Sequence, residues 1–131
     1  MSKSSTLTTV SAFKIDAVNK TVTAIEIPVN DGCCDLDTMY KEIGCDCFTC
    51  AQFARGKNGG SEDVFVDDNG LLTDPQHFFT IAGYPSPLAG NGIVLGTDEE
   101  GNSTDSSLTL ERVKKIVSFY DRNEIVLRNM Q

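Results

Sequence analysis

Apolar and polar residues alternate over two stretches near the start of the chain. Phe13 and Ile15 alternate with charged neighbours, and after a break at residues 17–20 a second alternation covers residues 22–27 and ends at Pro28. A period of two is typical of a β-strand with one buried face, and proline ends such a strand because it has no N–H to donate. The pattern therefore predicts a β-hairpin.

Later stretches are rich in β-branched and aromatic residues and are separated by turns that contain glycine, proline or acidic residues. We expect strands at residues 45–54, 62–72, 77–83 and 92–97, and an edge strand at residues 124–130. The second of these strands runs into Asn69-Gly70, a dipeptide typical of tight hairpin turns. The run Ile93-Val94-Leu95 has no polar position, which indicates a strand that is buried on both faces.

Two stretches follow the helical period instead. In residues 35–44, Asp35 suits the N-cap and Gly44 suits a left-handed C-cap. The apolar positions between them form one face: Leu36, Met39, Tyr40 and Ile43. In residues 108–121, Thr109 is the expected N-cap. The core-facing stripe of this second helix is Leu110, Val113, Ile116, Val117 and Tyr120.

The order of these elements defines a fold class. We predict an α+β fold with a mostly antiparallel sheet of about five to seven strands and two helices on one face. A length of 131 residues suits one domain. We expect a flexible, Ser/Thr-rich segment at residues 1–8 and a single domain at residues 9–131.

Charge is distributed unevenly along the chain. The formal net charge is -8, and no lysine or arginine lies between Ser61 and Ser107. This acidic span would repel the phosphates of a nucleic acid and attract a basic protein surface. We therefore expect a protein partner and no direct binding to nucleic acid.

The same sequence gives no indication of a membrane protein. No apolar run approaches the roughly 20 residues that a transmembrane helix needs. The first six residues are mostly polar. A signal peptide would instead have an apolar segment after its charged start. We expect a cytoplasmic protein with no membrane partner, and the sequence leaves its oligomeric state open.

The stretch 88–105 contains glycines, a short apolar run and several acids, so we tested it for ligand motifs. Gly90, Gly92 and Gly96 are one residue off the dinucleotide fingerprint, and a strand follows them where that fingerprint requires a helix. The acidic turns at Gly70 and Gly101 lack both end ligands of an EF-hand calcium loop. We interpret the stretch as a strand and a turn, and expect no cofactor.

The cysteines form a second candidate site. The chain has five of them: Cys33, Cys34, Cys45, Cys47 and Cys50. An odd number argues against a disulfide framework. Only Cys47 and Cys50 have the spacing of a zinc knuckle. We expect these residues to act mainly as small hydrophobes, with no bound metal. A cysteine-based zinc protein and redox chemistry through Cys47 and Cys50 are the alternatives.

A pocket for a small molecule is a further alternative. His77 is the only histidine, and a small-molecule binder or enzyme would place a pocket near His77, Tyr84, Asn91 and the loop that begins at Gly83 and ends at Gly92. No nucleophile, base and orienting group are spaced in a way that indicates nucleophilic catalysis. We therefore favour a protein that is not an enzyme.

Four segments together resemble a family of small acidic proteins. They are EIGCDCF, DVFVDDNGLL, FFTIAGYPSPLAGNGIVLGTDEEG and SLTLERV, at residues 42–48, 63–72, 78–101 and 107–113. The family is a domain of unknown function, encoded largely by bacteriophages, other mobile elements and the bacteria that carry them. The resemblance implies no activity and no catalytic residue. It implies a setting in which small acidic proteins often occupy a host protein.

These observations lead to one hypothesis. We expect a non-enzymatic acidic binding protein, an accessory protein of a phage or mobile element, that occupies a basic surface of a host protein. The expected contact residues lie in two acidic turns: Asp67, Asp68, Asp98, Glu99, Glu100 and Asp105. This hypothesis requires the fold to bring the two turns together.

Overall fold

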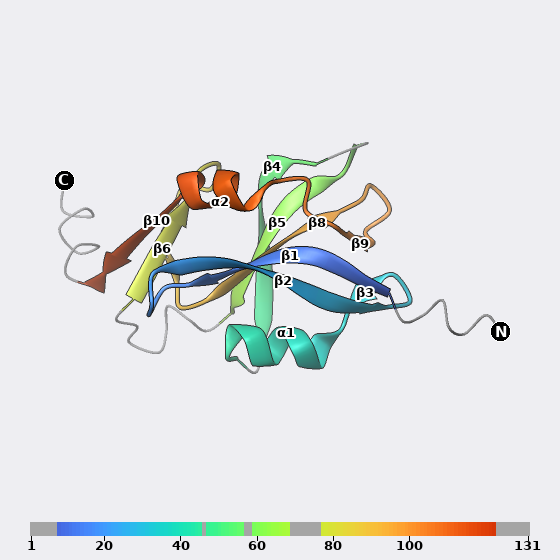
Figure 1. Cartoon of the computed structure of the whole chain (residues 1–131), viewed down its shortest axis with the longest axis horizontal. Coiled ribbons are helices and arrows are strands. Elements are labelled where there is room, and N and C mark those ends of the chain that lie inside the picture. The colour runs from blue at the N-terminus through green and yellow to red at the C-terminus, as the bar shows by residue number, and fades with distance from the viewer. Residues whose placement is uncertain (1–7, 46, 57–58, 69–76, 123–131) are drawn as a thin grey trace.

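The computed structural model describes residues 8–45, 47–56, 59–68 and 77–122 (Figure 1). The elements of this part of the chain are, in order, β1 (Thr8–Asp16), β2 (Thr21–Asn30), β3 (Cys33–Cys34), α1 (Leu36–Ile43), β4 (Phe48–Arg55), β5 (Ser61–Asp67), β6 (His77–Ile81), β7 (Leu88–Ala89), β8 (Gly92–Thr97), β9 (Ser103–Thr104), α2 (Leu110–Ile116) and β10 (Val117–Asp121). None of the helices in these residues is long and apolar enough to cross a membrane.

A large antiparallel sheet forms the centre of the molecule. Its strand order is β3-β2-β1-β8-β5-β4, and the short β9 also pairs with β8. Every strand pair in it is antiparallel, so the prediction of a mostly antiparallel sheet is confirmed. A second, smaller sheet has the order β10-β6-β7. The sequence pattern does not show that the strands divide into two sheets.

The predicted hairpin at the start of the chain is present as β1 and β2, but β2 continues past Pro28 to Asn30, which corrects the prediction that Pro28 ends it. Its turn is held by the Asp16 carboxylate, which accepts hydrogen bonds from the backbone N–H groups of Val18 and Asn19, both at 3.1 Å. Lys20 closes the turn in the left-handed conformation, with φ of 58°. This conformation is uncommon for a lysine.

Strand β8, in the middle of the central sheet, is buried on both faces, as the run at residues 93–95 predicts. All three residues of that run are 0 % exposed. Because side chains alternate along a strand, Val94 packs with α2 and the small sheet, whereas Ile93 and Leu95 pack with α1. The apolar core is therefore divided into two layers by the central sheet.

The two helices lie on opposite faces of the central sheet, which differs from the prediction that they share one face. Figure 1 shows α1 on one side of the sheet and α2 on the other. Met39 and Ile43 of α1 belong to one core layer, and Val113 of α2 belongs to the other. The reason is that the middle strand β8 is buried on both faces, so the sheet needs a covering layer on each side of it.

Helix α1 begins and ends where the sequence predicts. The Asp35 side chain accepts a hydrogen bond from the Thr38 N–H at 3.0 Å, and Gly44 ends the helix with φ of 81°. Met39 and Ile43 are buried as expected. Leu36, which the helical spacing places on the same face, is instead 54 % exposed; it is the first residue of the helix.

Helix α2 is shorter than predicted. Its N-cap is Thr109, as expected, but the helix ends at Ile116 and residues 117–121 form β10. This strand pairs with β6, and Phe119 lies opposite Phe79. Pairing with an existing strand outweighs the helical spacing of this segment, whose β-branched and aromatic residues favour a strand.

Several predictions fall on parts of the chain outside the described residues. These are the Asn69-Gly70 turn, the edge strand at residues 124–130, and residues 1–7 of the expected flexible segment.

Candidate functional site

A small hollow lies at the end of the central sheet where β5 begins and β8 ends. Its volume is about 250 Å³. The lining residues are carboxylates and hydroxyls, with no lysine, arginine or histidine among them: Ser61, Glu62, Thr97, Asp98, Thr104, Asp105 and Ser107. We call this feature the acidic hollow. Its position follows from the pairing of Ser61 with Thr97 and of Gly96 with Thr104.

Glu62 forms the inner wall of the acidic hollow and is only 1 % exposed. Its carboxylate accepts hydrogen bonds from the Ser106 hydroxyl at 2.6 Å, the Ser107 N–H at 2.8 Å and the Ser107 hydroxyl at 2.9 Å. Hydrogen bonds of this kind offset the cost of burying a charge. Glu62 therefore fixes the segment that leads into α2.

The turn between β8 and β9 forms the outer wall. The Asp98 carboxylate accepts hydrogen bonds from the Glu100 and Asn102 N–H groups, both at 2.9 Å. The Asp98 pKa lies below its ordinary value, chiefly because the Asn102 backbone donates a hydrogen bond to the charged carboxylate. The Asn102 side chain and the backbones of Glu100 and Gly101 lower the pKa further, whereas partial burial acts in the opposite direction. Glu99 and Glu100 follow in the turn and are exposed.

Asp105 completes the acidic hollow from the segment after β9. It is exposed, and its carboxylate accepts a hydrogen bond from the Ser11 N–H of β1 at 2.7 Å. On the opposite face of β5, Asp63 is buried and accepts hydrogen bonds from Ser61 and Thr97 at 2.9 and 2.7 Å. Carboxylates therefore lie on both faces of the sheet at this end.

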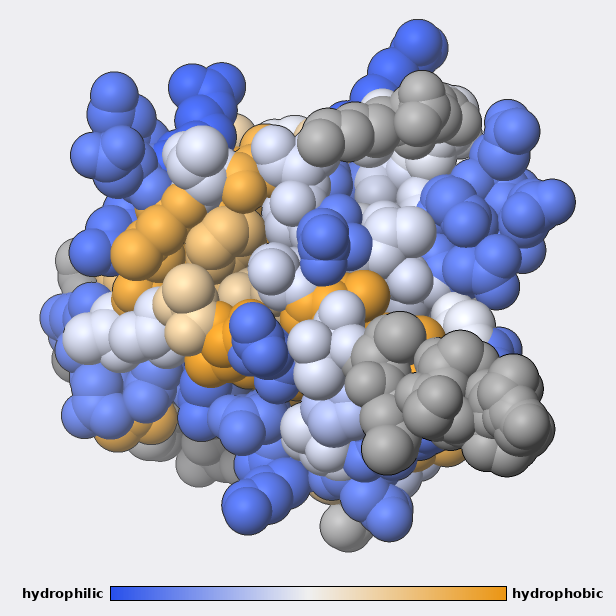
Figure 2. Space-filling model, turned by 45° about the vertical axis from the view of Figure 1, so that its right-hand side comes forward, coloured by the Kyte–Doolittle hydropathy of each residue, from blue (hydrophilic) through white to orange (hydrophobic). Residues whose placement is uncertain are grey.

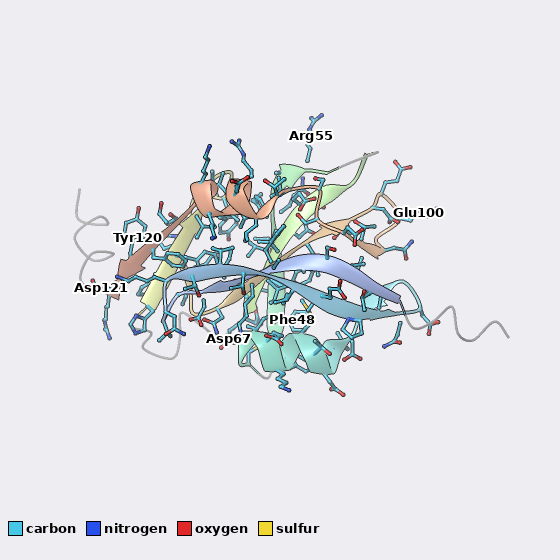
Figure 3. The ribbon with its side chains drawn as sticks, in the orientation of Figure 1. Phe48, Arg55, Asp67, Glu100, Tyr120 and Asp121 are labelled. Atoms are coloured by element: carbon cyan, nitrogen blue, oxygen red, sulfur yellow. The ribbon has the colours of Figure 1, made fainter. Side chains whose placement is uncertain are left out.

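The two acidic turns predicted as one contact surface lie at opposite ends of the central sheet. Ser61 pairs with Thr97, next to Asp98, whereas Asp67 lies at the other end of β5. Six residues of strand separate these two ends, which corresponds to roughly 20 Å. Figure 3 shows Asp67 and Glu100 far apart in the molecule. The structure therefore groups Asp98, Glu99, Glu100 and Asp105, and leaves Asp67 and Asp68 separate.

At the other end of β5, the Asp68 carboxylate accepts a long hydrogen bond from the Cys47 thiol, at 3.9 Å. The Asp68 backbone N–H also bonds to the Cys47 carbonyl, at 2.9 Å. These contacts join the end of β5 to the segment before β4. Asp67 is the last residue of β5, opposite Phe48 of β4, and Asp68 directly follows it.

The residues of the alternative small-molecule pocket serve the fold in several ways. The Asn91 side chain accepts a hydrogen bond from the Ala17 N–H at 3.3 Å, and Tyr84 packs against one core layer. A side chain at Gly83 would meet the Phe53 carbonyl oxygen of β4, so the loop lies directly on that strand. His77, at the start of β6, pairs with Asp121, and its buried Nδ1 has no hydrogen-bond partner among the described residues.

The cysteines are spread over several environments. Cys33, Cys47 and Cys50 are exposed, Cys34 is buried and Cys45 is half-buried. Burial raises the pKa of the Cys34 thiol, and burial together with the Asp63 charge raises the pKa of Cys50, so neither thiol is activated as a thiolate. Within the described ranges, no three His, Cys, Asp or Glu side chains are grouped so that they could hold a metal ion.

Glu62 and Asp63 are the site residues that sequence analysis missed as a pair. They lie at the start of an apolar strand, where two consecutive acids necessarily point to opposite faces of the sheet. Because both faces are covered, both carboxylates are buried. Two consecutive acids within an otherwise apolar strand are the sequence signal that could have identified Glu62 and Asp63 as buried carboxylates.

The architecture defines a class of protein: a small β-rich domain in which one antiparallel sheet is covered by a helix on one face and by a helix and a second sheet on the other. The chain belongs to the family of the domain of unknown function DUF3846, whose model matches residues 11–120. Comparisons with curated proteins and with solved structures gave no match.

Proposed function

We propose that this protein is a non-enzymatic binding protein whose acidic hollow receives a basic side chain of a partner protein. The single observation that supports this function best is a hollow lined by Glu62, Asp98 and Asp105 with no cation among its lining residues. At about 250 Å³ it is smaller than the roughly 300 Å³ at which pockets for drug-sized ligands begin. The end of one lysine or arginine side chain suits it better.

The surroundings of the acidic hollow support the same proposal. Glu99 and Glu100 are exposed beside it, and the span from Ser61 to Ser107 contains no lysine or arginine. Charges of one sign attract a partner of the opposite sign at long range and increase the association rate. Apolar contacts elsewhere in the interface would have to supply most of the affinity.

In the setting that the sequence suggests, the partner is a host protein and the chain is a phage or mobile-element accessory protein that acts in the cytoplasm. A basic patch on such a host protein would normally meet another acidic surface or a nucleic acid. Occupation of that patch by the acidic hollow would block the normal contact.

The test is capture of host proteins by the purified chain, with two matched pairs of substitutions. The first pair is Asp98→Asn with Asp105→Asn, which keeps an acceptor oxygen at both positions. The second pair is Asp67→Asn with Asp68→Asn, which removes the same charge at the other end of β5. We expect the first pair to lose the captured protein and the second to retain it, as measured by quantitative mass spectrometry.

Salt provides an independent arm of this test. An interaction led by charge weakens as ionic strength rises, because the Debye length falls from about 10 Å at 0.1 M to about 3 Å at 1 M. Capture that is unchanged at high salt, or that survives the Asp98 and Asp105 substitutions, would contradict the proposal. Loss of capture with the Asp67 and Asp68 pair alone would move the contact surface to the other end of the sheet.

A further inference from the structure

A second hollow surface lies far from the acidic hollow, between the β1–β2 hairpin and the segment that contains α2 and β10. It has a volume of about 550 Å³ and is lined by residues 20–23 together with Lys114, Val117 and Phe119. We call it the basic groove. Figure 2 shows apolar side chains bordered by hydrophilic ones on the side of the molecule where α2 lies. The lining combines apolar contact area with two lysines and no acid.

The two lysines of the basic groove have no acidic residue beside them in its lining. Neither Lys20 nor Lys114 forms an ion pair with a described residue, whereas Lys14 on another face is paired with Glu42 at 3.1 Å. In a chain with a net charge of -8, two lysines beside one apolar surface whose lining contains no acid form a local positive region. Such a surface is complementary to a negatively charged ligand.

The conformation of Lys20 is a second observation. Its φ of 58° lies in the left-handed region, where glycine or asparagine is favoured over lysine. The turn is fixed by Asp16, which accepts hydrogen bonds from the Asn19 backbone at 3.1 Å and the Asn19 side chain at 2.8 Å. The backbone therefore does not explain a lysine here. A strained residue of this kind points to a role for its side chain.

Two of the strands that line the basic groove, β2 and β10, have edges that are open to further pairing. β2 pairs with β1 along one edge, and along the other edge it pairs only at Val29 and Asn30, with β3. β10 is an edge strand that pairs with β6. In the part of the chain that the structure describes, no strand pairs with the remaining edge of β2 or of β10. Open edges are places where an extended peptide can add as a further strand.

We infer that the basic groove binds an extended acidic segment of a partner protein. The segment lies along the open edge of β2, with carboxylates near Lys20 and Lys114 and apolar side chains against Val117 and Phe119. A protein segment fits better than a nucleic acid, because a long polyanion needs a wide basic surface and the acidic remainder of this chain would repel it. This surface is separate from the acidic hollow and does not depend on its function.

The test uses a fluorescein-labelled ten-residue peptide of alternating glutamate and valine, titrated with the whole chain and followed by fluorescence anisotropy. We expect Lys20→Gln with Lys114→Gln to weaken binding by at least about tenfold. The matched control is Lys41→Gln with Lys115→Gln, which removes the same charge from α1 and from another position on α2. We expect this control to change binding by less than about twofold. Circular dichroism melting checks that both variants are folded.

Several results would overturn the inference. These are no binding of the glutamate peptide, equal binding of the same peptide with lysine in place of glutamate, or equal weakening by both pairs of substitutions. Tighter binding of a ten-nucleotide single-stranded DNA would assign the basic groove to nucleic acid. Self-association in sedimentation experiments that only the groove pair abolishes would assign it to a second copy of the chain. Backbone NMR shifts confined to residues 20–23 and 114–119 would support the inference.

Discussion

The acidic hollow and the basic groove are two charged surfaces of one small domain, and they differ in what holds their charges. At the acidic hollow, Glu62, Asp98 and Asp105 all accept hydrogen bonds from backbone or hydroxyl groups. At the basic groove, Lys20 and Lys114 have no partner among the described residues. Most of the acidic charge therefore also supports the fold, whereas the two lysines leave their charge available to a ligand.

This difference changes how the net charge of -8 should be interpreted. Beside the acidic hollow, Glu99 and Glu100 are exposed and accept no hydrogen bond from the described residues. A count of acids along the sequence does not separate them from structural carboxylates such as Glu62. Fewer acidic charges at the acidic hollow are therefore free to meet a partner than the sequence suggests.

Among the substitutions that would sharpen the comparison between the two surfaces, we expect the loss of the Glu62 carboxylate to have the largest effect on stability. Glu62→Ala leaves three donors on Ser106 and Ser107 without an acceptor. We expect the free energy of unfolding to fall by about 3 kcal/mol, at about 1 kcal/mol for each lost bond, as measured by urea denaturation. Glu62→Gln keeps one carbonyl oxygen as an acceptor and should cost less. Equal stability of the alanine variant would show that Glu62 is not a structural carboxylate.

Local signals in the sequence predict the parts of the fold that depend on them. The N-caps at Asp35 and Thr109, the left-handed Gly44 and the β1–β2 hairpin are all confirmed. The turn between β2 and β3 carries another such signal, Asp31-Gly32. Both of its residues have positive φ, 53° and 81°, as a type I′ turn requires. Its dipeptide is a standard hairpin signal, so the sequence alone could have predicted this turn.

The features that sequence analysis missed depend on contacts between distant segments. The helical spacing at residues 113–120 is real, but it cannot show that β6 offers an edge to which Val117 and Phe119 pair. The position of the acidic turns likewise depends on strand order, since β5 and β8 run antiparallel and carry Asp67 and Asp98 to opposite ends. The basic groove unites Lys20 and Lys114, which lie far apart in the sequence.

A smaller effect is expected from pH at the turn that forms the outer wall of the acidic hollow. The pKa of Asp98 in the folded chain lies below its ordinary value of 3.8, because the turn donates hydrogen bonds to the charged carboxylate. Asp98 therefore stabilises the fold fully above the ordinary pKa, and this contribution is lost as the pH falls through the lower folded value. Asp98→Asn should be less stable than the native chain at pH 7, and the difference should shrink below about pH 4.

The measurement for Asp98 is urea denaturation of both chains at pH 7, 4 and 3. Glu99→Gln removes the same charge from the same turn but no acceptor of a described hydrogen bond, so it should lower stability less at pH 7. A difference for Asp98→Asn that stays constant down to pH 3 would show that the turn does not stabilise the charged form. The acidic hollow would then resemble the basic groove, with charge that the fold does not use.

The smallest effect, and the most specific one, is expected from Lys20→Gly. Glycine adopts the positive φ of this position without strain, whereas an L-residue there costs about 1 kcal/mol. The greater flexibility of glycine in the unfolded chain offsets part of this gain. We therefore expect the variant to be more stable by about 0.5 kcal/mol, as measured by thermal and urea denaturation.

The same Lys20→Gly variant should bind the glutamate–valine peptide more weakly, because it lacks one of the two cations of the basic groove. Higher stability combined with weaker binding would show that Lys20 is kept for its charge at the expense of the turn. Asn19→Gly, in the same turn, is a control that leaves both lysines in place and should not weaken binding. If Lys20→Gly lowers stability, the strain at Lys20 is absent, and the second observation that supports the basic groove is lost.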